Sequence, residues 1–307
     1  IALIGLASTT DPTFIKLFFL LHQAIPALLI FSLDIFLEGT LHTQTAIGKI
    51  RSSYLTAINI GFVISPIIVG KIINASSYQA VYLMSAVFCG IFLILTLDSF
   101  RTIKTRELKE INFSESIRVF LKHKDLGRIF IINFLLQSFY AVMVIYIPFY
   151  LYNTIGFSWQ SIGLIFTVML IPFVLFEAPL GRLFDTRHTE KDTLIAGFCI
   201  MMIATISMFF IHTPHIGIWM LVLFVSRVGA SFVEIGSDYA FFGRVSDEDV
   251  GLISVFKMTS PLAYIIVPLL VQPFINILPL NYILLLVGMG LSIGTVFSYK
   301  IKTIHLD

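Results

Sequence analysis

Four polar residues interrupt one otherwise apolar run of the sequence. Arg227, Ser231, Glu234 and Asp238 follow one another at intervals of four, three and four residues, so a helix places their side chains on one face. A buried guanidinium can hold a negative or polar group of a ligand. Burial favours the neutral form of a carboxylic acid, so Glu234 could load and release a proton. The alternative is structural: Arg227 could pair with Glu234, or with an acid on another helix, and hold the helices together.

Two further apolar runs carry polar side chains at similar intervals. Asn133, Gln137 and Tyr140 recur at intervals of four and three residues, and Gln23 lies in an earlier run. We expect these four residues to line a substrate cavity together with Arg227, where they donate and accept hydrogen bonds.

Other acids in apolar runs allow two interpretations. Glu177 is a second candidate for proton coupling, after Glu234. The acids Asp34, Glu38, Glu177 and Asp238 could instead lie near the cytoplasmic membrane surface, where they are hydrated and pair with basic residues of the loops. Neither a cluster of His and Cys with metal-ligand spacing nor a phosphate-binding glycine loop occurs in the sequence. We therefore expect no metal, no cofactor and no enzyme activity.

The composition identifies the elements that position these residues. Hydrophobic residues make up 57% of the chain and charged residues 12%, against about 25% charged residues in soluble domains. Runs of roughly 20 apolar residues can each cross a bilayer as a helix. The sequence therefore predicts an all-α polytopic membrane protein. Ahead of the runs, IALIGLAST is expected to be the end of a helix whose start is missing. The nine predicted spans are 15–38, 51–72, 79–98, 129–151, 160–181, 193–212, 216–242, 251–274 and 281–299.

The basic residues predict the orientation of the chain. Of the 20 Lys and Arg residues, 17 fall in connections on one side of the predicted spans, and cytoplasmic loops collect such residues. This bias predicts a cytoplasmic C-terminus in the plasma (inner) membrane. It also accounts for the basic residues without any nucleic-acid site.

One connection is much longer than the others and predicts the domain organisation. It separates an N-terminal bundle at 1–98 from a C-terminal bundle at 129–307, with a linker at 99–128. In the linker, Phe113, Ile117, Phe120 and Leu121 form an apolar stripe on a helix. Such a helix could lie on an anionic membrane face, or the segment could be a solvated basic linker.

A repeat relates the two bundles. Asp34 corresponds to Asp238, and Gly39 to Gly243, at an offset of 204 residues. Each acid stands at the predicted cytoplasmic end of a helix, with the glycine just after it. Both copies have the same orientation in the membrane, as expected for a parallel repeat of two halves.

Two stretches resemble motifs of the major facilitator superfamily, especially its drug/proton antiporters. GFVISPIIVG is similar to the fifth-helix motif, although Ser65 and Val69 replace two of its glycines. EAPLGRLFDTRHTEK is similar to the loop between helices 8 and 9, which is a conformational gate in this family. The matching residues are Gly61, Pro66 and Gly70 in the first stretch and Gly181, Asp185 and Arg187 in the second.

The resemblance implies two six-helix bundles, of which the end of helix 3 and helices 4 to 12 are present. It further implies a monomer in contact with membrane lipids that moves a small molecule by alternating access. We expect proton-coupled efflux of small amphiphilic compounds. The alternatives are proton-coupled uptake of a nutrient or organic anion, and a sensor that has the fold but does not transport.

Overall fold

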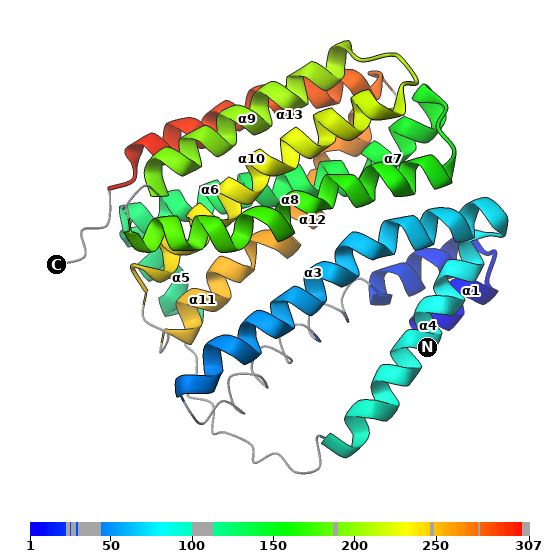
Figure 1. Ribbon diagram of the computed structural model, residues 1–307, viewed down its shortest axis with the longest axis horizontal. Helices are drawn as coiled ribbons and strands as arrows, with labels where there is room; N and C mark the ends of the chain where they lie inside the picture. Colours follow the sequence, from blue (N-terminus) through cyan, green and yellow to red (C-terminus); the bar gives the residue numbers. More distant parts are fainter. Residues whose placement is uncertain are drawn as a thin grey trace. The chain divides into compact units, whose positions relative to one another are not determined.

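The protein is described here from a computed structural model (Figure 1). The structure describes residues 1–22, 25, 29, 44–99, 113–186, 190–245, 249–275 and 277–302. Within these ranges, the side chains of 44–56, 59, 98–99, 113, 121, 177–178 and 181–186 lie outside the description. Every element of regular structure in the described residues is a helix. The predicted all-α fold class is therefore confirmed.

Seven helical segments of the described chain are long and apolar enough to cross a membrane. They coincide with seven of the nine predicted spans. Of the other two, 51–72 lies inside α3 (Gln44–Ala75), and 15–38 falls mostly outside the described residues. The seven segments are Tyr78–Leu97, Lys124–Ile155, Trp159–Phe176, Glu190–Phe210, Ile216–Phe242, Val250–Ile275 and Leu280–Lys300.

The chain divides into two compact units, and the division falls within the predicted linker. Unit 1 comprises Ile1–Lys109 and unit 2 comprises Glu110–Asp307. In unit 1, α1 (Ala2–Ser8) and α3 both pack against α4 (Tyr78–Ser99). Leu6 of α1 is buried there. Pro66 lies inside α3, which continues through it as one helix.

Unit 2 is a helical bundle built around α10 (Ile216–Phe242). The faces of α10 contact α6 (Lys124–Ile145), α8 (Trp159–Thr186) and α9 (Glu190–Phe210). The bundle is completed by α12 (Thr259–Ile275) against α6 and by α13 (Leu280–Lys300) against α9 and α6. Figure 1 shows α10 running beside α9 and α8. On this central helix the side chains of Ser226, Arg227, Ser231 and Ser237 are buried.

Glycines allow α9 and α10 to approach closely. A Cβ atom on Gly229 would lie 2.6 Å from the carbonyl oxygen of Gly197, and one on Gly197 would lie 2.7 Å from the carbonyl oxygen of Gly229. Small residues commonly permit such backbone contacts between membrane helices. The pair fixes the position of α9 next to the segment of α10 that carries Arg227.

The amphipathic helix expected in the linker is α5 (Phe113–Lys122). It packs against α6 and α11 (Val250–Lys257), with its Phe120 only 5% exposed. The Phe120 ring stacks on Phe241 at 6.1 Å between centroids, and Phe241 stacks on Phe256 at 4.1 Å. On the remaining surface of α5, Ile117 is 39% exposed. Part of the predicted apolar stripe therefore packs on unit 2.

Two of the spans of unit 2 are interrupted where the sequence predicted continuous helices. Met258 separates α11 from α12. The span that begins with α6 continues as α7 (Ile147–Tyr150) and as the π-helix η2 (Leu151–Ile155). Pro148 at the start of α7 has no backbone N–H to donate to the preceding turn. Gly156 ends η2 with a φ of +87°, which glycine adopts without strain.

Candidate functional site

Arg227 lies inside the bundle among aromatic side chains. It is 2% exposed, and its Cζ atom lies over the rings of Tyr140 at 4.9 Å, Phe139 at 5.4 Å and Phe173 at 6.0 Å. These rings stabilise the charge through cation–π interactions but accept no conventional hydrogen bond from it. Its buried Nε and Nη2 atoms have no hydrogen-bond partner among the residues that the structure describes. Arg227 therefore has N–H donors without a described acceptor at a buried position, where such donors lower the stability of the fold.

Tyr140 connects Arg227 to Glu234. Its hydroxyl donates a hydrogen bond of 2.9 Å to Oε2 of Glu234, while its ring lies under the guanidinium. The predicted spacing on α6 and α10 places both residues on facing surfaces of the two helices. A change of charge on Glu234 therefore alters the hydrogen bond from Tyr140, whose ring contacts the guanidinium of Arg227.

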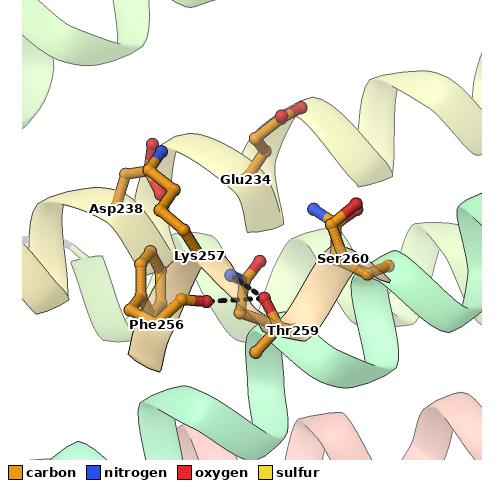
Figure 2. Close-up of a pocket in the computed structure, with 8 residues that line it drawn as sticks. Glu234, Asp238, Phe256, Lys257, Thr259 and Ser260 are labelled. Carbon is orange, nitrogen blue, oxygen red and sulfur yellow. Dashed lines mark hydrogen bonds between the residues drawn. The ribbon is translucent and has the colours of Figure 1, made fainter. Parts of the chain in front are cut away.

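A small polar cavity of about 70 Å³ adjoins Glu234 (Figure 2). This volume suits about two water molecules, given the space of roughly 30 Å³ that each occupies in the liquid. Sites for drug-sized ligands are larger, at about 300 Å³ or more. The cavity is lined from α6, α10, α11 and α12 by Asn133, Gln137, Glu234, Asp238, Phe256, Lys257, Thr259 and Ser260.

Hydrogen bonds hold the wall of this cavity together. The Nδ2 atom of Asn133 donates to Oγ1 of Thr259 at 2.9 Å, and this hydroxyl donates to the carbonyl oxygen of Phe256 at 2.8 Å. Phe256 is near the end of α11, so the bond satisfies a carbonyl next to the break at Met258. Asn133 therefore ties α6 to the junction of α11 and α12.

The structure brings most of the polar residues predicted on α6 and α10 into one region. Gln137 lines the cavity, Tyr140 bonds Glu234, and Asp238 lines the cavity one turn further along α10. Ser231 differs, because its hydroxyl donates to the carbonyl oxygen of Val228 in its own helix at 2.8 Å.

The sequence interpretation missed the residues that complete the region. Phe139 and Phe173 were indistinguishable from other apolar residues of the spans. Lys257, Thr259 and Ser260 are adjacent in a run predicted as continuous helix. Their concentration of polar groups was the available signal for a break at this point.

Several predicted site residues cannot be placed at the level of their side chains. Gln23, Asp34, Gly39 and Arg187 lie outside the described residues. The backbone of α8 includes Glu177, Gly181 and Asp185, but their side chains are outside the description.

The predicted motif residues of unit 1 and the glycine that follows α10 are described. Gly61 and Gly70 lie on α3 with Pro66, and a Cβ on Gly61 would meet no atom within 4 Å. Gly243 caps α10 with a φ of −71°, an ordinary right-handed conformation. No backbone requirement for glycine is visible at either position.

Two arginines hold the end of α13 and the residues after it, Arg244 just after α10 and Arg128 near the start of α6. Arg244 donates to the carbonyl oxygens of Ala240 and Lys302. Arg128 donates to the carbonyl oxygen of Lys300 and pairs with Asp125 at 2.8 Å. Burial lowers the pKa of Arg244, while the carboxylate of Asp125 acts in the opposite direction. The polar network lies outside the membrane-spanning part of α10.

Comparison with known proteins gives the family of the chain. No curated protein matches it. The family model described as Major Facilitator Superfamily matches residues 43–268, which is well over half of the sequence. The match includes α6, α8, α9 and α10, and thus the residues around Arg227 and Glu234. The chain therefore belongs to the Major Facilitator Superfamily and is an integral, multi-pass membrane protein, a secondary transporter of a small-molecule substrate.

Proposed function

We propose that this transporter is proton-coupled and that Glu234 takes up and releases the proton. The observation that carries the proposal is the hydrogen bond from the Tyr140 hydroxyl to Glu234 beside the buried Arg227. A carboxylate within a span is rare and expensive, so its presence calls for a role. The ionised carboxylate is stabilised by this donor and by the nearby positive charge. The protonated acid is favoured when those contacts loosen.

The cavity next to Glu234 supports this role. Its lining is rich in hydroxyl, amide and charged groups, and its volume of about 70 Å³ can hold water. Water in contact with the carboxylate provides a route by which a proton can arrive and leave. In an alternating-access cycle, such a route needs to open to only one side at a time.

The first candidate function is efflux of small amphiphilic compounds by proton antiport. The partial fifth-helix motif with Gly61, Pro66 and Gly70 supports it. The aromatic rings of Phe139 and Phe173 beside Arg227 also support it, because they suit an apolar ligand body.

Proton-coupled uptake of a nutrient or organic anion is the second candidate. A specific observation favours it: Nε and Nη2 of Arg227 are buried, and no described residue accepts a hydrogen bond from them. An anion would supply the missing acceptors. The two candidates differ in the direction in which the proton and the substrate move, so flux measurements separate them.

The proposal is tested with the full chain in proteoliposomes. A pH gradient is imposed, and lumenal pH is followed while cationic dyes and organic anions are added in turn. We expect substrate-dependent proton flux in the wild type and its loss in Glu234→Gln. The control is Asp249→Asn, which removes an exposed carboxylate outside the spans and should leave flux unchanged. Equal flux in the wild type and Glu234→Gln would refute the assignment of Glu234.

A further inference from the structure

We propose that Arg227 binds a carboxylate group of the substrate and that this carboxylate travels in the same direction as the proton on Glu234. The inference rests on the proposed proton-coupled function and adds the chemical class of the substrate and the sign of the coupling. Three features carry it: the unmet donors of Arg227, the aromatic rings around them, and the balance of charge with Glu234.

The two unpartnered nitrogens of Arg227 are the pair that a carboxylate recognises. Nε and Nη2 are neighbours on one side of the planar guanidinium, and their N–H bonds point in nearly the same direction. Two parallel hydrogen bonds from such a pair to the two oxygens of a carboxylate form the bidentate arrangement typical of arginine. Both atoms are buried and have no acceptor in the described part of the chain. A carboxylate therefore satisfies both donors with a single ligand group.

The surroundings of Arg227 indicate the rest of the ligand. The guanidinium carbon lies over the rings of Phe139, Tyr140 and Phe173. These contacts use the π faces of the rings, which leaves the in-plane N–H groups of the guanidinium for the ligand. Side chains of this kind pack well against an apolar or aromatic body. The preferred substrate is accordingly a small carboxylate with an apolar or aromatic body.

The charges around Arg227 and Glu234 determine whether the carboxylate and the proton favour or oppose each other's binding. Arg227 and the ionised Glu234 are linked through Tyr140 and together carry no net charge. Tyr264 also interacts with Arg227 and is neutral. In the adjoining cavity, Asp238 and Lys257 have opposite charges. Counted over the side chains that the structure describes here, a bound carboxylate leaves one uncompensated negative charge, and a proton on Glu234 removes it.

The carboxylate and the proton therefore strengthen each other's binding. Such a coupling is reciprocal, so each ligand raises the affinity for the other by the same factor. Ligands that bind together move together through an alternating-access cycle, which is symport. A cationic substrate would behave in the opposite way, since it would compete with the proton for the negative charge of Glu234.

The first experiment uses three probes that share one ring and differ in charge: benzoate, benzamide and benzamidinium. Their binding to the full chain in lipid nanodiscs is measured by calorimetry in two buffers of different ionisation enthalpy, which reveals protons taken up or released. Hydrogen bonds to a charged group are worth about 1.5–3 kcal/mol, so benzoate should bind roughly 10- to 100-fold more tightly than benzamide. Benzoate binding should also take up protons.

Two variants assign the effects to residues. Arg227→Lys keeps the charge but lacks the paired donors, so it should reduce benzoate affinity to that of benzamide. Glu234→Gln should still bind benzoate but take up no proton. Arg118→Gln, at an exposed position on α5, is the control and should match the wild type. Fluorescence of the buried Trp219 reports folding of each variant. If Arg227→Lys does not fold, the probe series on the wild type alone decides.

Several outcomes would overturn the inference. Equal binding of benzoate and benzamide, or no binding of any probe, excludes the carboxylate site. Tightest binding of benzamidinium with proton release also excludes it, yet leaves the proton-coupled function of Glu234 standing. Failure of that function looks different, because it shows as unchanged proton flux in Glu234→Gln whichever probe binds.

Discussion

The close contact of α9 and α10 allows a quantitative prediction for Gly229→Ala. The added Cβ would lie 2.6 Å from the carbonyl oxygen of Gly197, 2.8 Å from the backbone nitrogen of Met201 and 2.9 Å from its Cγ. Ordinary van der Waals contact begins at 3.4 Å. The two nearest atoms belong to backbone, so a side-chain rotation cannot relieve the contact. The helices must separate by about 0.8 Å at this point, as the two distances require.

Overpacking of a rigid interior typically costs about 1–3 kcal/mol, although alanine is a better helix former than glycine by about 1 kcal/mol. Gly290→Ala on α13 is the matched control, since its Cβ would meet no atom within 4 Å. The control should therefore be as stable as the wild type or more stable, while Gly229→Ala should be less stable than the wild type by up to about 2 kcal/mol and less stable than the control by about 1–3 kcal/mol.

Unfolding in mixed micelles of increasing denaturing detergent measures this difference. Tryptophan fluorescence follows the loss of packing, since one of the two tryptophans, Trp219, is fully buried on α10. Gly229→Ala should unfold at a lower fraction of denaturing detergent than Gly290→Ala. Coincident transitions of the two variants would show that the close approach of α9 and α10 contributes no stability, and would refute the reasoning.

Three further changes test other parts of unit 2. Phe120→Ala removes a buried ring that stacks on Phe241, and should lower stability by about 3–5 kcal/mol; detergent unfolding measures it, and exposed Val119→Ala is the control. Thr259→Val removes the acceptor of Asn133 and should cost about 1–3 kcal/mol; a fully stable variant would contradict the role of this bond. Arg244→Gln removes the guanidinium donor to the Lys302 carbonyl, so hydrogen exchange near the end of α13 should accelerate; unchanged exchange would count against the contact.

The fold followed from the sequence to the extent that local patterns determine it. Length and apolar composition define a membrane helix without knowledge of its neighbours, which is why seven predicted spans are found in the structure. At the junction of α11 and α12, Asn133 of α6 donates a hydrogen bond to Thr259, which lies 126 residues away in the sequence. The polar residues Lys257, Thr259 and Ser260 mark the position of the junction, but they do not indicate which helix contacts it.

The site was predictable only in part for a related reason. Polar residues are rare in the predicted spans, so their spacing placed Tyr140 on a polar face of one helix and Arg227 and Glu234 on a polar face of another. Predicting the hydrogen bond between Tyr140 and Glu234 would have required the relative position of their two helices, because the residues are 94 positions apart in the sequence. Phe173 on α8 could not be found, since phenylalanine is abundant, with 30 in the chain, and its position in a run says little about its contacts.

The stacked rings of α5 have a consequence for where the chain can be cut or exchanged between homologues. Phe120 covers Phe241, which in turn covers Phe256, so the last part of the linker is built into the C-terminal bundle. A chimera joined just before α6 would replace Phe120 and leave Phe241 at a foreign surface. A junction ahead of Glu110 keeps the three rings together, and it coincides with the boundary between the two compact units.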